Sequence, residues 1–295
     1  MKSGIADDAR QLDTNLHLLG ENEMNASTFS AIAKRLRTGI WIVSAATFIF
    51  AVACGEGGGA SAENRDDSFE VGAAPRLVVQ GENGSIIVRP SADDVIRVQA
   101  VLQRPNRQEY SVNQAGDTIT VTVEQKNSFW NFNRGPQANI EITAPAATRV
   151  ELRNSNGSVE VHGMQRSGNI RSSNGAITVE DVSGEFEIET SKGEVTAVRA
   201  VGTFQIKTSN GEIEFDGELV AGGDNLMRSS NGSVDVKLQE TPSVELDAST
   251  SNGSLTTELP ILTSSTGDED HLTGTIGNGE AKLVVKTSNG SITIR

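Results

Sequence analysis

The dipeptide Asn-Gly recurs along the second half of this chain at a nearly constant interval. From Asn156 the steps are 18, 18, 18, 21 and 21 residues to Asn252 and then 37 to Asn289, and Lys192-Gly193 takes the place of the dipeptide once. Self-similarity at a period near 20 residues is typical of proteins built from stacked repeats, in which each unit buries its apolar side against its neighbours. The chain is therefore expected to be an array of short units.

Each copy of the repeat alternates apolar and polar residues on both sides of the dipeptide, as in FQIKTSNGEIEF (204–215) and LVVKTSNGSITI (283–294). A period of two indicates strand, turn, strand. The pattern predicts an all-β fold, a β-solenoid resembling a parallel β-helix, with 18–21-residue repeats that bend at Asn-Gly. The alternative is an antiparallel β-sandwich of hairpins. We favour the solenoid because the whole Ser/Thr-x-Asn-Gly string recurs in phase, which a hairpin tip does not require.

The alternation also predicts which side chains face the interior. It places Phe204, Ile206, Thr208 and Asn210 inside, and a bend at the glycine returns Ile213 to the interior. We therefore expect a buried ladder of asparagine amides running down the stack. Its members are Asn156, Asn174, Asn210, Asn231, Asn252 and Asn289.

The N-terminal region has the pattern of a secretory signal. Basic residues at 34–37 precede an apolar run at 39–53, which is shorter than the ~20 residues that span a bilayer. The run ends in Ala-Val-Ala followed by Cys54, which resembles a bacterial lipobox and predicts lipidation of Cys54 and attachment to a membrane. An ordinary signal peptide with a chance cysteine and an uncleaved anchor are the alternatives.

These features divide the chain into four parts. Residues 1–53 form a signal region that is removed, with Met24 as a candidate true start, and 54–70 form a flexible Gly/Ser/acidic tether. Residues 71–149 form an irregular N-terminal β part, and 150–295 form the regular repeats.

Composition limits the chemistry available to the chain. It has 25 Lys+Arg against 39 Asp+Glu, a net charge of −14, which argues against nucleic acid as a partner. One Cys leaves no internal disulfide and no thiolate metal site, and three His leave little for His-based catalysis. No metal, cofactor or catalytic residue is expected. Glu185, Glu187 and Glu189 alternate on one strand, which predicts a solvated outer face rather than a pair of glycosidase acids.

One segment concentrates the scarce aromatic residues. Phe129, Trp130 and Phe132 lie beside Arg134, within the stretch NSFWNFNRGP. Exposed, they could stack on sugar rings or anchor a partner. The other interpretation is that this loop folds back and caps the open end of the solenoid.

The opening LVVQGENGSIIV, the passage IEITAPAATRVELRNSNG and the later Ser-Asn-Gly repeats together resemble the putative-adhesin family of β-strand-repeat proteins. The likeness covers roughly residues 70–295. That family consists of bacterial envelope proteins of unknown function, so the resemblance implies a β-solenoid-like fold and an envelope location. It supplies no catalytic residues.

The sequence therefore predicts a non-enzymatic, lipid-anchored protein of the bacterial cell envelope, with a repetitive surface for adhesion, binding or scaffolding. Beyond the membrane, its expected partner is an envelope polysaccharide or protein. Two alternatives stay open: a polysaccharide-active β-helix enzyme, and an envelope-stress module that binds cationic compounds.

Overall fold

The computed structural model describes residues 62–126, 135–239, 242–263 and 270–295, all of which belong to one compact unit, Thr47–Arg295. Strands dominate this part of the chain. In order, its elements are β1 (Ala62–Glu70), β2 (Arg76–Asn83), β3 (Ile86–Ser91), β4 (Val95–Gln103), the 3-10 turn η1 (Pro105–Arg107), β5 (Gln108–Ala115), β6 (Thr118–Gln125), β7 (Gln137–Pro145), β8 (Arg149–Asn156), β9 (Val159–His162), β10 (Gly168–Asn174), β11 (Ile177–Glu180), β12 (Ser183–Lys192), β13 (Val195–Asn210), β14 (Ile213–Leu219), β15 (Asp224–Asn231), β16 (Val234–Leu238), β17 (Val244–Asn252), β18 (Leu255–Thr257), β19 (Leu262–Thr263), β20 (His271–Ile276), β21 (Ala281–Asn289) and β22 (Ile292–Ile294).

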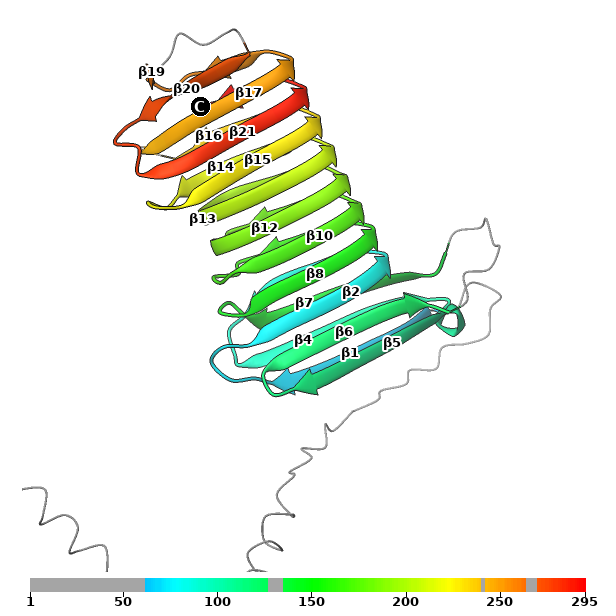
Figure 1. Cartoon of the computed structure of the whole chain (residues 1–295). Coiled ribbons are helices and arrows are strands. Elements are labelled where there is room, and N and C mark those ends of the chain that lie inside the picture. The colour runs from blue at the N-terminus through cyan, green and yellow to red at the C-terminus, as the bar shows by residue number, and fades with distance from the viewer. Residues whose placement is uncertain (1–61, 127–134, 240–241, 264–269) are drawn as a thin grey trace, which may run out of the picture. The chain divides into compact units, whose positions relative to one another are not determined.

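The repeats form coils that stack in parallel. In each coil a first strand, such as β8, reaches the Asn-Gly bend and continues as a second strand, such as β9, on the other side of the core. Successive coils pair in parallel register, so that Asn156, Asn174 and Lys192 occupy equivalent positions (Figure 1). The predicted β-solenoid is confirmed, and the sandwich of hairpins is not the fold of the repeats.

The coils have two faces. The first strands form the front face and the second strands form the back face, and the long β13 contributes its C-terminal half to the front and its N-terminal half to the back. The front face runs in the order β2, β8, β10, β12, β13, β15, β21 and β17. The back face runs in the order β3, β9, β11, β13, β14, β16, β22 and β18.

The C-terminal coil does not lie at the end of the stack. β21 pairs with β15 on one side and with β17 on the other, so the coil of β21 and β22 is inserted before the coil of β17 and β18. Figure 1 shows this as a red strand between yellow and orange ones. Along the sequence, the coil of β17 and β18 comes first. The chain then returns through β20, which pairs antiparallel with β17, and the coil of β21 and β22 takes the position between β15 and β17. The 37-residue step between Asn252 and Asn289 is this detour.

Antiparallel strands close the N-terminal end. β1 pairs with β4 and β4 with β7 on the back face, and β5 pairs with β6 on the front. The expectation of a flexible tether over 54–70 is wrong for 62–70, because these residues form β1. Their composition resembles that of a tether because an edge strand, which packs on only one side, tolerates many charged residues. Such charges also discourage pairing with the strands of other chains.

The irregular part predicted for 71–149 contains one complete coil. β2 and β3 enclose an Asn-Gly bend, and Asn83 aligns with Asn156 of the next coil. The regular stack therefore begins at Arg76. The expected boundary at 149 failed because 57 residues, 92–148, which include the antiparallel strands of the N-terminal end, separate the end of β3 at Ser91 from the start of β8 at Arg149.

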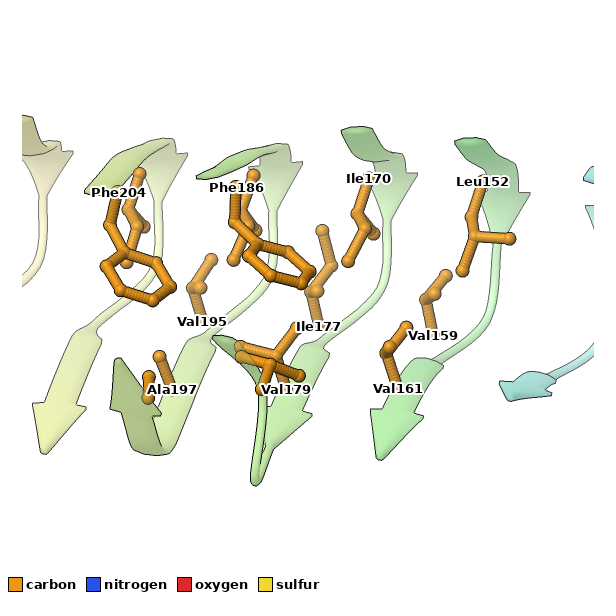
Figure 2. Close-up of a cluster of buried hydrophobic side chains, with 14 of the residues drawn as sticks. Leu152, Val159, Val161, Ile170, Ile177, Val179, Phe186, Val195, Ala197 and Phe204 are labelled. Carbon is orange, nitrogen blue, oxygen red and sulfur yellow. The ribbon is translucent and has the colours of Figure 1, made fainter. Parts of the chain in front are cut away.

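The core lies between the two faces along the whole stack. Figure 2 shows Leu152, Ile170, Phe186 and Phe204 of the front face pointing toward Val159, Ile177 and their equivalents on the back face. The rings of Phe186 and Phe204 stack with centroids 5.9 Å apart, and Phe204 meets Phe215 edge-on at 5.1 Å. Room for the ring of Phe186 comes from Gly168, where an added Cβ would lie 2.4 Å from that ring.

A column of glycines follows the bends from coil to coil. An added Cβ on Gly175 would lie 2.0 Å from the carbonyl oxygen of Gly157, and one on Gly211 would lie 1.8 Å from that of Gly193. Real Cβ atoms do not approach oxygen so closely. Neither of these glycines has φ in the left-handed region, so the requirement for glycine here comes from the close approach of neighbouring backbones.

This contact predicts the effect of a single methyl group. Gly175→Ala should lower the free energy of unfolding by about 3 kcal/mol or more, at the upper end of the cost of overpacking, because the atom it meets is backbone. Gly116→Ala is the control: its φ is +60° and nothing lies within 4 Å of an added Cβ. That variant should lose only about 1 kcal/mol, from backbone strain alone.

Urea denaturation of both variants checks this prediction. Equal losses for the two would mean that the backbones at the bends are not in contact.

Candidate functional site on the front face

A row of buried polar side chains lies two residues before each bend position. Its members are Asn154, Ser172, Thr190, Thr208, Ser229, Thr250 and Thr287. The Thr208 hydroxyl donates to the carbonyl oxygen of Gly193 at 3.1 Å, and that of Ser229 donates to Gly211 at 2.9 Å. Thr190, Thr250 and Thr287 make the equivalent bond to a glycine of the neighbouring coil. These hydroxyls donate hydrogen bonds to the glycine carbonyls at the bend, where the chain passes from the first strand of a coil to the second.

The row has one irregular point. The Asn154 amide donates to Gly84 at 2.8 Å and to Gly157 at 3.1 Å. The buried Ser172 hydroxyl, at the equivalent position of the next coil, has no hydrogen-bond partner among the described residues.

The asparagines of the bends lie on the surface. Asn156, Asn174, Asn210, Asn231, Asn252 and Asn289 are all exposed, so the expectation that their amides are buried is wrong. The last inward position in each strand is the polar residue two places earlier, because the chain begins to turn at the asparagine. Sequence reasoning assigned Thr208 to the interior but overlooked its row as the buried polar ladder, although Ser or Thr precedes most of the dipeptides at that spacing.

The exposed amides nevertheless bond to one another. The side-chain amide of Asn174 donates to that of Asn156 at 3.0 Å, and Asn231 donates to Asn210 at 3.0 Å. Asn289 donates to Asn231 at 2.9 Å and Asn252 to Asn289 at 3.1 Å. Lys192 stands between the two runs, and its side chain is exposed.

Two further rows of outward side chains cover the front face beside the asparagines. The serine row comes directly before the bend position and consists of Ser155, Ser173, Ser191, Ser209, Ser230, Ser288 and Ser251. The cation row lies two residues earlier and consists, in spatial order, of Arg153, Arg171, Glu189, Lys207, Arg228 and Lys286. Neighbouring strands are ~4.8 Å apart, so both rows repeat at that spacing.

Acids in the cation row and in the next outward row toward the strand starts neutralise part of the cation row. Arg171 contacts Glu187 at 2.9 Å and Glu189 at 3.4 Å, and Lys286 contacts Asp247 at 3.1 Å. Arg153, Lys207 and Arg228 have no ion pair within the described part of the chain. Glu185, Glu187 and Glu189 lie on the outer face, as predicted from their spacing, and two of them are held by the single Arg171.

Acidic side chains outnumber basic ones on the back face. Glu160, Glu180, Glu214, Asp216 and Asp235 point outward there, against Arg89, Lys237 and Arg295. Arg199, at the edge where one coil passes to the next, donates to Glu180 and, at 2.6 Å, to Asp181. These hydrogen bonds lower the pKa of both carboxyl groups. His162, the last residue of β9, lies 3.1 Å from Glu180 and takes part in this cluster.

Several predicted sites lie outside the described residues. These are the lipidation site Cys54, the aromatic segment with Phe129, Trp130, Phe132 and Arg134, and the signal region. Within the part that the structure describes, no helix has the length and apolar character needed to cross a membrane.

A hollow of about 390 Å³ opens where the stack order changes, between β14, β16 and the start of β17. Its lining includes Glu218 and Glu280 but neither Lys nor Arg. No group of His, Cys, Asp and Glu able to hold a metal ion occurs among the described residues. The hollow thus provides two carboxylates and no basic side chain.

Comparison with known proteins assigns the family. The model of the Toastrack DUF4097 family matches residues 75–217 and 137–295, which together span the coils and most of the N-terminal end. The chain belongs to the Toastrack DUF4097 family. This match confirms the resemblance drawn from the repeats. No curated protein matches this Toastrack chain in sequence.

Solved structures similar to this Toastrack chain share little sequence with it. A putative adhesin from Bacteroides fragilis is 16% identical, with a TM-score of 0.40 over 80% of this chain and 99% of the other. A putative cell adhesion protein from Clostridium sporogenes is 11% identical, with a TM-score of 0.36 over 79% and 99%. A putative lipid binding protein from Parabacteroides distasonis is 13% identical, with a TM-score of 0.39 over 79% and 97%.

The two polar rows at the bends of this Toastrack chain predict different mutational costs. Thr208→Val removes a hydroxyl that is 5% exposed and leaves the Gly193 carbonyl without its partner, so it should cost about 1–3 kcal/mol. Asn210→Leu removes exposed hydrogen bonds and should cost about 0.5 kcal/mol. Thermal unfolding of the two variants ranks them. A larger loss for Asn210→Leu would place the stabilising row at the asparagines.

Proposed function

We propose that the chain is a non-enzymatic, lipid-anchored protein of the bacterial cell envelope, whose rigid solenoid presents the front face as a binding surface. The observation that carries this proposal is the repetition of that face. Like side chains occupy like positions in successive coils, in parallel register, over the serine row and the cation row.

Repetition favours binding over catalysis. A catalytic centre brings a few unlike groups together at one point, with a nucleophile, a base and a charge stabiliser in mutual reach. The front face instead offers rows of like groups, which suit a partner that repeats or extends. The hollow beside β17 holds two carboxylates without a Lys or Arg, so it lacks the combination of acids and cations expected of a polysaccharide lyase.

A lipid on Cys54 would hold the protein by its N-terminal end. Seven residues, 55–61, lie between Cys54 and the start of β1 at Ala62, so the two Cα atoms are eight steps of the chain apart (62 − 54 = 8). Fully extended, they reach at most about 28 Å. The end of the stack that carries β1 and β5 would then stay near the membrane, and the front face would remain accessible along the coils.

The anchor is tested by fractionation of cells that express the full chain. Cys54→Ala should move the protein from the membrane fraction to the soluble fraction, while Ser61→Ala, a control outside the lipobox, should leave it in the membrane. Membrane retention of the Cys54→Ala protein would mean that the apolar run at 39–53 is an uncleaved anchor.

The binding role is tested with the same soluble Cys54→Ala protein. It should be retained by purified cell-wall and membrane fragments of the envelope, and this retention should show saturation. Failure to bind any envelope fraction would contradict the proposed function.

A further inference from the structure

We infer that the front face binds a linear anionic polysaccharide, which lies along the stack and crosses successive coils over the cation row and the serine row. This inference rests on the proposed binding function and names its partner by chemistry. It is carried by the register of the charged side chains, by Lys207 and Arg228, which have no ion pair among the described residues, and by the hydroxyls beside them.

The cation row concentrates positive charge on a chain whose net charge is −14. Five of the six positions from β8 to β21 carry Lys or Arg, and Glu189 is the exception. In particular, Lys207, Arg228 and Lys286 are immediate neighbours on three adjacent strands. The cation row therefore places one basic side chain on each coil over most of its length.

Neighbouring like charges on adjacent strands destabilise a sheet. A chain with 39 acidic residues could neutralise each of them, and it does so for Lys286, which contacts Asp247 at 3.1 Å. Lys207 and Arg228 are left without an ion pair in the described part of the chain. Negative charges supplied by a bound polymer would remove this repulsion.

The serine row distinguishes a polysaccharide from other polyanions. Ser209 and Ser230 lie two residues from Lys207 and Arg228 on the same strands, so the two rows run parallel about 6.6 Å apart. A hydroxyl both donates and accepts hydrogen bonds, which matches the hydroxyl groups of a sugar polymer. Each coil thus offers a charge for an acidic group and a neutral polar group for the sugar ring.

Two other anionic partners fit this face less well. Single-stranded nucleic acid is bound by cationic grooves that also carry aromatic side chains for base stacking. The outward positions of the front-face strands, over their described residues, carry no aromatic side chain. A membrane-binding surface needs apolar side chains at its contact, and the most exposed large apolar residues, Val101, Val201, Val220 and Leu262, lie outside both rows.

The test measures binding of the purified full chain, in detergent, to polygalacturonate, a linear polymer with one carboxylate per sugar. Wild type should bind, and binding should weaken as salt is added. The double variant Lys207→Gln/Arg228→Gln should bind about tenfold more weakly. Its matched control is Arg107→Gln/Arg166→Gln, which removes two exposed cations off the row and should bind as wild type does.

A second variant pair separates the polysaccharide from a generic polyanion. Ser209→Ala/Ser230→Ala should weaken polygalacturonate binding about fivefold, since it removes neutral hydrogen bonds. It should leave the binding of inorganic polyphosphate unchanged. Equal melting temperatures of all variants show that the fold is intact.

Three results would overturn the inference. The first is that the wild type does not bind polygalacturonate. The second is that Lys207→Gln/Arg228→Gln and its control Arg107→Gln/Arg166→Gln weaken the binding equally. The third is tighter binding to phosphatidylglycerol vesicles or single-stranded DNA than to polygalacturonate. Retention on envelope fragments reports separately on the proposed function. Retention without polygalacturonate binding would overturn the partner and leave the binding role standing.

Discussion

The close approach of backbones at the bends is the contact on which the rest of the structure depends. Each glycine of the column lies so near the carbonyl of the preceding glycine that a single added Cβ would collide with it, and in spatial order this holds from Gly157 to Gly253. The tight bend lets both strands of a coil face one core. The buried hydroxyls then satisfy the glycine carbonyls that the bend removes from the strand pairing. Regular stacking, and with it the straight outer rows, follows from this contact.

The repeat period and the alternation were sufficient to predict the solenoid, its bends and the inward positions of residues such as Phe204 and Ile213. They were not sufficient to tell which polar residue at the bend is buried, because Thr208 and Asn210 share the same phase. The copy at Lys192-Gly193 indicates which of the two is exposed. There the asparagine is replaced and the glycine is kept, as expected if the glycine meets a neighbouring backbone and the asparagine faces solvent.

The order of the coils and the extent of the N-terminal end could not be predicted in this way. A repeat pattern shows that coils stack but gives no information on which coil lies beside which, since the coils of β21 and β17 present similar aliphatic and threonine side chains to either neighbour. The cation row depends on that order, because it brings Lys286 beside Arg228 across 58 residues of sequence (286 − 228 = 58). β1 was missed because its charges suit an edge strand as well as a tether. The proposed function therefore depends on the register between strands that are far apart in sequence, which only the structure shows.

Disulfide trapping of cysteine pairs in the serine row tests this arrangement most directly. In a Cys54→Ala background, Ser230→Cys with Ser288→Cys, and Ser251→Cys with Ser288→Cys, should each cross-link, because adjacent strands lie ~4.8 Å apart and disulfides join Cα atoms up to about 7 Å apart. Ser230→Cys with Ser251→Cys should not, because the inserted C-terminal coil separates them by about 9.6 Å. Non-reducing gels and mass spectrometry of the linked peptides give the answer. Cross-linking of 230 with 251 but not with 288 would mean that the coils stack in sequence order and would contradict this account.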